Sequence, residues 1–296
     1  MLAQHIVCMY NGDFNQCSTI MHPAINEQMK KYPSTPHVYG SRLQNGDDES
    51  TQTPYKNLKG KFIVIEEKKD GANSGFSFTD AGDLRLQSRG HFLLGGSRES
   101  QFGMFKSWVT HNESLFLERF EDRYIVYGEW MYEKHTIFYD NLPHLFLEFD
   151  IWDKQDARFL STAQRRALCK DLPIVSVPVL YEGIAPKKYA DVMDLVGPSS
   201  SKTANWEATL FDITQALNVD WERVKKQTLW HQGMEGLYIK VEDDTDTLER
   251  YKWVRPDFTQ AILDGDGHHQ HRMLVPNKLN PNVQLFEYQS SWDCSP

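Results

Sequence analysis

Short strand-like segments separated by turn-forming residues limit how this chain can fold. Apolar and β-branched residues gather in these segments, and Gly, Asp and Asn lie between them. The segments are 62–65, 74–79, 84–87, 124–127, 145–152, 236–242 and 250–254. Asp80-Ala81-Gly82-Asp83 is typical of a hairpin turn between two of them, and 243–246 is a second such loop. This spacing predicts antiparallel sheets.

Helical periodicity occurs between the strand segments. The expected helices are 100–108, 112–120, 162–170, 187–196 and 205–226. Ser161 can cap the third of these by accepting hydrogen bonds from exposed amides. Strands and helices do not alternate as in a doubly wound sheet, so the pattern predicts an α+β fold. Residues 1–60 are rich in turn formers and predict irregular structure.

Composition excludes several classes of protein. Hydrophobic residues make up 40% and charged residues 25% of the 296 residues, as in soluble globular proteins. No uninterrupted apolar run of about 18 residues occurs, and the N-terminus lacks the pattern of a signal peptide. The cysteines lack metal-ligand spacing, so we expect reduced thiols in a cytoplasmic protein with no membrane partner.

The net charge of −9 argues against indiscriminate binding of nucleic acid, because phosphate contacts need clustered Lys and Arg. It does not exclude a nucleic-acid enzyme. Such an enzyme can hold a local basic groove, and acidic residues that bind magnesium add to the negative total.

A charged motif ends the apolar strand segment at 62–65. It reads Glu67-Lys68-Lys69-Asp70-Gly71-Ala72-Asn73. Adjacent lysines at the end of a buried strand need a reason, because removing a charge from water is costly. The alternative is a solvated charged turn, and this segment alone does not decide between the two interpretations.

The motif K-x-D-G and the segments that follow it resemble the covalent nucleotidyltransferases, the superfamily of DNA ligases, RNA ligases and mRNA capping enzymes. The matching segments, in the family's order, are Ser88-Arg89-Gly90, Tyr127-Gly128-Glu129-Trp130, Phe146-Leu147-Glu148-Phe149-Asp150, Glu235-Gly236-Leu237-Tyr238-Ile239-Lys240 and Arg250-Tyr251-Lys252-Trp253. Their ordered occurrence carries the resemblance. Asn73 stands where DNA ligases and capping enzymes usually have arginine, so the chain resembles the RNA ligase branch.

The resemblance implies a fold and a division of the chain. The fold is an α+β nucleotidyltransferase fold, unrelated to ATP-grasp, with two antiparallel sheets flanked by helices around an ATP cleft. The implied parts are an N-terminal segment at 1–50 packed on the main domain, an adenylyltransferase domain at 51–258 and a short C-terminal appendage at 259–296. The appendage is too short for an OB-fold, which DNA ligases and capping enzymes usually carry.

The resemblance also implies the reaction of an ATP-dependent RNA ligase. Lys68 takes AMP from ATP, AMP passes to an RNA 5′-phosphate, and a 3′-hydroxyl then displaces AMP. Mg²⁺ or Mn²⁺ assists, and a separate kinase or phosphatase is a candidate partner that prepares the RNA ends. The alternatives are a DNA ligase, a guanylyltransferase or a non-catalytic RNA-binding module of the same fold.

Lys68 is the expected nucleophile. A lysine has an ordinary pKa of about 10.4, so only about one amine in a thousand is neutral near pH 7.4. Burial, the cations of Lys69, Lys240 and Lys252, and bound magnesium are expected to lower that pKa. Lys240 and Lys252 are also expected to stabilise charge on the α-phosphate. The alternation of apolar and polar residues along 236–242 predicts that Lys240 faces the cleft; an exposed lysine on an edge strand is the alternative.

Other residues are assigned to the nucleotide and the metal by the same resemblance. The metal residues are Glu129 and Glu235, since carboxylates bind hard cations. Phe149 is expected to stack on adenine, or else to be a core residue, and Glu67 matches the position that reads the adenine amino group. The full set of expected nucleotide contacts is Glu67, Asp70, Gly71, Asn73, Arg89, Glu129, Phe149, Lys240 and Lys252.

The last motif departs from the family's usual K-x-K. The chain has Arg250-Tyr251-Lys252, so Lys252 fits the motif, and Arg250 and Arg255 compete for the partner position.

Overall fold

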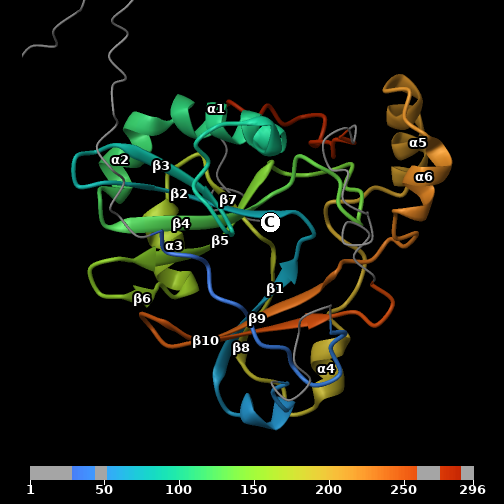
Figure 1. Cartoon of the computed structure of the whole chain (residues 1–296). Helices are drawn as coiled ribbons and strands as arrows, with labels where there is room; N and C mark the ends of the chain where they lie inside the picture. The colour runs from blue at the N-terminus through green and yellow to red at the C-terminus, as the bar shows by residue number, and fades with distance from the viewer. Residues whose placement is uncertain (1–28, 44–51, 259–273, 288–296) are drawn as a thin grey trace, which may run out of the picture. The chain divides into compact units, whose positions relative to one another are not determined.

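The computed structural model describes residues 29–43, 52–258 and 274–287. Nearly all of them belong to the second of two compact units, Met1–Lys30 and Lys31–Pro296. Within the second unit, two sheets and their flanking helices form an α+β fold (Figure 1), as the sequence predicts.

The smaller sheet is antiparallel and has the strand order β10-β9-β1-β8. Its strands are β1 (Phe62–Lys68), β8 (Val179–Ile184), β9 (Gly236–Glu242) and β10 (Thr247–Val254). Residues 36–42 run along the outer edge of β10, where the Val38 amide donates to the Lys252 carbonyl at 3.0 Å. The segment before the first strand therefore extends this sheet.

The larger sheet has the order β3-β2-β4-β5-β6, and β7 pairs with β5. Its strands are β2 (Ala72–Phe78), β3 (Leu84–Ser88), β4 (Tyr124–Trp130), β5 (Phe146–Asp153), β6 (Arg158–Phe159) and β7 (Val175–Ser176). The β2–β3 pair is the hairpin that the turn at 80–83 predicts. The β5–β7 pair is parallel, so the second sheet is not wholly antiparallel.

The helices largely follow the predicted periodicity. They are α1 (Gly103–His111), α2 (Glu113–Phe120), α3 (Thr162–Cys169), α4 (Tyr189–Met193), α5 (Trp206–Ala216) and α6 (Trp221–Lys226), with 3-10 turns η2 (Tyr55–Asn57) and η3 (Ser97–Phe102). Ser161 caps α3, since its hydroxyl accepts from the Gln164 amide at 3.3 Å. The single helix predicted at 205–226 is wrong: Asn218 has a positive φ of 52° and Asp220 caps a new helix.

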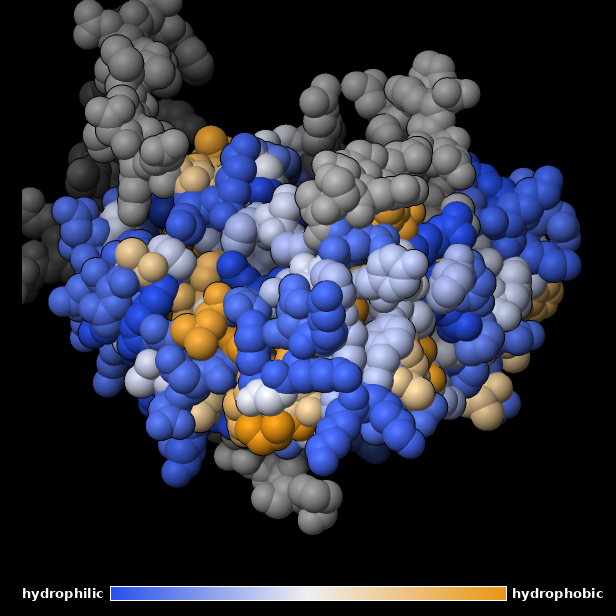
Figure 2. Space-filling view, turned by 90° about the horizontal axis from the view of Figure 1, so that it is seen from below, coloured by the Kyte–Doolittle hydropathy of each residue, from blue (hydrophilic) through white to orange (hydrophobic). Residues whose placement is uncertain are grey.

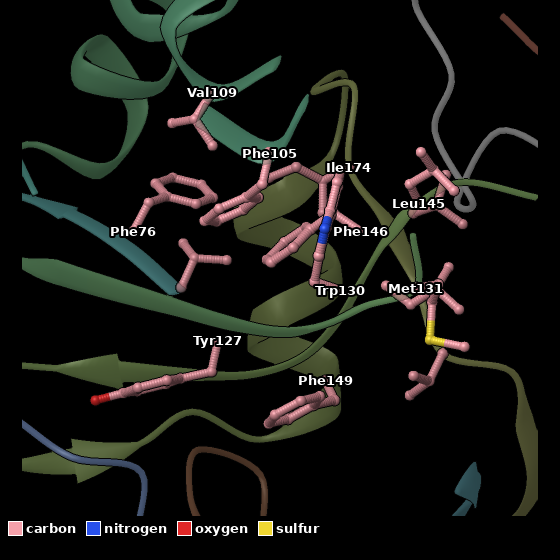
Figure 3. Packing of buried hydrophobic residues seen from close by; sticks show 14 of the residues in the cluster. Phe76, Phe105, Val109, Tyr127, Trp130, Met131, Leu145, Phe146, Phe149 and Ile174 are labelled. Atoms are coloured by element: carbon pink, nitrogen blue, oxygen red, sulfur yellow. The ribbon is translucent and has the colours of Figure 1, made fainter. Parts of the chain in front are cut away.

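A hydrophobic core joins α1 and α2 to one face of the larger sheet. Phe105 and Phe146 pack on this side, whereas Tyr127 and Phe149 lie on the other side of the strands (Figure 3). Gly128 permits the packing, because a Cβ there would lie 2.4 Å from the Phe146 ring. The second face of the larger sheet is thereby left to meet the smaller sheet.

The surface visible in Figure 2 is mostly hydrophilic, with apolar residues in small groups. Scattered apolar residues of this kind are usual on a folded protein. In the parts of the chain that the structure describes, no helix is long and apolar enough to cross a membrane.

Candidate nucleotide site

A cavity of about 530 Å³ lies where the two sheets meet. This volume is in the range of small-molecule sites. Its walls comprise Tyr32, Pro33, Thr35, Glu66, Glu67, Lys68, Lys69, Asp70, Gly71, Ala72, Asn73, Ser88, Arg89, Gly90, His91, Gln101, Phe102, Glu129, Phe149, Val177, Glu235, Tyr238, Lys252 and Val254. The folding of the chain thus brings together every predicted site residue except Lys240.

Lys68 ends β1 inside this cavity, next to carboxylates. Its ammonium lies 2.7 Å from the Glu235 carboxylate, and its side chain is 24% exposed. Burial disfavours the ammonium, but the negative charges of Glu235, Glu129 and Asp70 outweigh it and raise the pKa of Lys68. The residues around Lys68 therefore raise its pKa instead of lowering it, and the lowering expected from bound magnesium stays a prediction.

Lys69 follows the last residue of β1 and does not act on Lys68 as expected, because its own charge is paired. Its ammonium pairs with the Glu67 carboxylate at 2.8 Å and donates to the Ser201 hydroxyl at 2.8 Å. The Ser199 hydroxyl also donates to Glu67, at 2.5 Å. An adenine amino group would have to compete with these partners for the Glu67 carboxylate.

Glu129 and Glu235 hold their protons more tightly than ordinary carboxyls. Burial raises the pKa of Glu129 to about 7, although Lys68 acts against this. Burial likewise raises the pKa of Glu235 to about 8, and Asp70 and Glu129 add to the effect. Both carboxyls therefore gain and lose their protons near neutral pH, where an ordinary glutamate is already fully ionised.

Covalent labelling by ATP is expected to rise with pH through this range. Below about pH 7 both carboxyls are protonated and Lys68 is charged; above about pH 8 the carboxyls are free to bind a cation. The neutral amine also becomes more abundant as pH rises. Initial rates at saturating ATP and Mg²⁺ across this interval test the sign, and a rate that falls with pH would contradict it.

Gly71 and Asp70 shape the wall beside Lys68. A Cβ on Gly71 would lie 2.7 Å from the Trp130 carbonyl oxygen, so glycine alone allows β2 this close to β4. The Gly71 amide donates to the Glu129 carboxylate at 3.1 Å. Asp70 accepts from the amides of Thr136 and Ile137, each at 2.7 Å. Asp70 therefore holds the loop after β4.

Lys240 does not face the cavity. Its completely buried ammonium lies 3.0 Å from both Glu66 and Asp150 and donates to the Phe149 carbonyl. Arg165 completes the cluster by pairing with Glu66 at 3.0 Å. The alternation of residues does place Lys240 and Tyr238 on one face of β9, but at Lys240 the larger sheet covers that face.

An aromatic wall occupies the cavity beside this ion cluster. The Phe149 ring lies 5.1 Å from Tyr32 and 6.4 Å from Tyr238 between centroids. The Tyr32 hydroxyl donates to Asp150 and lies 2.5 Å from the Tyr238 hydroxyl. The sequence did not indicate Tyr32 as a site residue, since a lone tyrosine in an irregular segment carries no recognisable motif.

The two arginines that competed for the last motif lie outside the cavity. Arg250 approaches Asp150 at 3.7 Å and stacks over Phe159 at 3.7 Å. Arg255 pairs with Asp257 at 2.5 Å. Lys252 lines the cavity, opposite Tyr238 in the β9–β10 register.

Unsatisfied acceptors in the walls fit a bound ligand. Within the described ranges, Asn73 Oδ1 and Gln101 Oε1 are buried without hydrogen-bond partners, and both residues line the cavity. A buried acceptor left unpaired costs about 1–3 kcal/mol. Hydroxyl donors, such as those of a ribose, would satisfy them. Gln101 is a second cavity residue that the sequence did not indicate.

The donor set suits a divalent cation only in part. Among the residues that the structure describes, no three His, Cys, Asp or Glu side chains are grouped to hold a metal ion by themselves. Mg²⁺ commonly binds one or two carboxylates and completes its shell with phosphate oxygens and water. Glu129 and Glu235 fit that mode.

The fold and cavity define an α+β protein with a lysine-containing cavity of about 530 Å³ between two largely antiparallel sheets. The chain belongs to the RNA ligase family, whose model matches residues 61–254. No curated protein matches the chain.

Solved structures of the Naegleria gruberi RNA ligase match the chain at low identity. The structure with PPi is 20% identical, covers 77% of this chain and 61% of its own, and has a TM-score of 0.46. A variant with ATP and Mn is 16% identical, covers 76% of this chain and 58% of its own, and has a TM-score of 0.47. The match thus spans less than two thirds of the length of the Naegleria gruberi ligase chain in both structures.

Proposed function

We propose that this chain is an ATP-dependent RNA ligase that joins a 3′-hydroxyl to a 5′-phosphate through AMP bound covalently to Lys68. The observation that carries the proposal is the Lys68 ammonium, which lies in the cavity 2.7 Å from Glu235. Family membership supports the same activity.

The geometry of β1 suits an adenine nucleotide. Glu66 is opposite Tyr238 and Lys68 is opposite Gly236, so the aromatic wall and the nucleophile are two residues apart, about 7 Å along the strand. Adenine would lie against Phe149 and Tyr238, with the α-phosphate at Lys68. Arg89 and Lys252 would bind phosphates, and Asn73 and Gln101 would accept from the ribose hydroxyls.

The covalent step follows from these positions. Lys68 releases its proton to solvent, and its neutral nitrogen then attacks the α-phosphorus. A phosphoramidate bond forms as the bond to pyrophosphate breaks and pyrophosphate leaves. Mg²⁺ or Mn²⁺, held by Glu129, Glu235 and phosphate oxygens, would neutralise charge on the phosphates. Lys252 would add charge stabilisation at the phosphates.

In the sealing steps that we propose, AMP passes from Lys68 to an RNA 5′-phosphate, and the 3′-hydroxyl of the other end then displaces it. A separate kinase or phosphatase would supply ends of this type. Asn73, where the DNA ligases and capping enzymes usually have arginine, favours RNA over the alternative acceptors.

The test is incubation of the full-length protein with Mg²⁺ and α-labelled ATP or GTP. Covalent label from ATP alone is expected, and label from GTP alone would identify a guanylyltransferase. Labelled protein is then offered nicked RNA, nicked DNA and single strands with 5′-phosphates. Sealing of DNA alone would indicate a DNA ligase, and absence of any label would indicate a non-catalytic RNA-binding module.

A further inference from the structure

The loop between β4 and β5 is unusual because it is irregular and yet buried. Residues 131–142 belong to this loop, and nearly all of them are buried. A buried loop cannot leave its amides and carbonyls to water, so other parts of the chain must bond them. The partners of this loop therefore show what fixes its position.

On one side, the loop is bonded by the nucleophile motif. The Asp70 carboxylate accepts from the amides of Thr136 and Ile137, each at 2.7 Å. The Asp70 amide in turn donates to the Tyr139 hydroxyl at 3.0 Å. Asp70 is only two residues from Lys68, so the position of the loop and the position of the nucleophile are coupled.

On the other side, the loop is bonded by residues 274–287, red in Figure 1. Asn277 is buried and uses both ends of its amide. Its Oδ1 accepts from the Tyr139 amide at 2.9 Å, and its Nδ2 donates to the Met131 carbonyl at 2.7 Å. Backbone bonds continue the contact, including Lys134 to Val275 at 2.8 Å.

We propose that Asn277 is a positioning residue for adenylylation, which acts on Lys68 through the loop at 131–142 and Asp70. The inference rests on the proposed function and assigns a role to a segment beyond the residues that the family model matches, 61–254. Asn277 does not line the cavity. Its loss should therefore affect the rate of attack more than the binding of ATP.

The first experiment compares Asn277→Ala with Asn282→Ala in the full-length protein. Asn282 is an exposed asparagine in the same segment. Its backbone amide donates to Asn280 Oδ1, and alanine at this position keeps that hydrogen bond. We expect Asn277→Ala to slow covalent labelling at saturating ATP about tenfold to a hundredfold, because small misplacements of reacting groups have effects of this size. The ATP concentration for half-maximal rate should change less than about threefold.

A second readout needs no nucleotide. In Asn277→Ala, hydrogen exchange at the amides of Tyr139, Thr136 and Ile137 should accelerate at least tenfold. The Tyr139 amide loses its acceptor, and the amides of Thr136 and Ile137 lie in a loop that is no longer held by Asn277. Asn282→Ala should leave these rates unchanged. Asn277→Asp guards against failure to fold, since it keeps an acceptor for Tyr139 and loses the donation to Met131.

The outcomes separate the inference from the proposed function. If the wild-type protein and a folded Asn277→Ala variant are labelled by ATP at the same rate, the inference about Asn277 is refuted and the proposed function stands. Normal labelling with loss of RNA sealing would also overturn it and would indicate that the segment binds RNA. If the wild-type protein takes no label but hydrogen exchange is accelerated in Asn277→Ala, the proposed function is refuted. Asn277 would then only stabilise the position of the loop.

Discussion

Replacing Lys68 by alanine is expected to abolish covalent transfer of AMP. The ammonium of Lys68 lies among the wall residues of the cavity, and no hydroxyl or thiol can form the same phosphoramidate. The expected loss is complete within detection, because the variant lacks the nucleophile itself. The protein is incubated with α-labelled ATP and Mg²⁺ and then denatured, and the bound label is measured before and after treatment with acid. Acid should remove the label from the wild type, since acid breaks a phosphoramidate bond.

Two variants serve as controls for this result. Lys59→Ala removes an exposed lysine nine residues earlier in the chain and should label like the wild type. Lys68→Arg keeps the positive charge beside Glu235 and should fold normally without accepting AMP, since a guanidinium is not deprotonated in proteins. Unchanged label on Lys68→Ala would move the covalent site elsewhere and refute the assignment.

Replacing Lys240 by alanine is expected to destabilise the fold by about 3–5 kcal/mol, the cost of breaking a buried ion pair. Its ammonium is fully buried between Glu66 and Asp150, and both carboxylates would lose a charge partner. Urea denaturation monitored by tryptophan fluorescence gives the change in the free energy of unfolding.

Lys252→Ala is the matched comparison. Lys252 is only half-buried and lines the cavity, so we expect about 1 kcal/mol or less of lost stability together with slower labelling by ATP. Equal stability losses in the two variants would contradict this division of roles between the lysines.

The pH dependence of the Lys240→Ala defect has a definite sign. Burial raises the pKa of Glu66, and the Lys240 and Arg165 charges oppose that rise. Without Lys240, the folded-state pKa of Glu66 rises further above its unfolded value. The cost of its buried negative charge is then largest at neutral pH and shrinks as the pH falls through the folded-state pKa. The stability difference between variant and wild type should therefore narrow on acidification.

Much of the fold follows from local pattern. The strands β1, β2, β3, β4, β5, β9 and β10 were all foreseen, because alternation and apolar content are properties of a few adjacent residues. The strands β6 and β7 were missed because each has two residues, and β8 because it is a half-exposed edge strand that contains Gly183. The appendage predicted at 259–296 lies partly outside the described residues, and the three-part division of the chain stays a prediction.

The sequence by itself determined that Lys68 ends a buried strand in a K-x-D-G motif and that matching motifs follow in order. Only the tertiary structure decided the charge around each lysine. Lys68 forms an ion pair with Glu235, and Lys240 forms one with Asp150. Asp70 accepts a hydrogen bond from the loop that Asn277 also bonds. The physical reason is that periodicity sets which face of a strand a side chain takes, whereas its pKa and burial depend on residues that only the packing of the two sheets brings near.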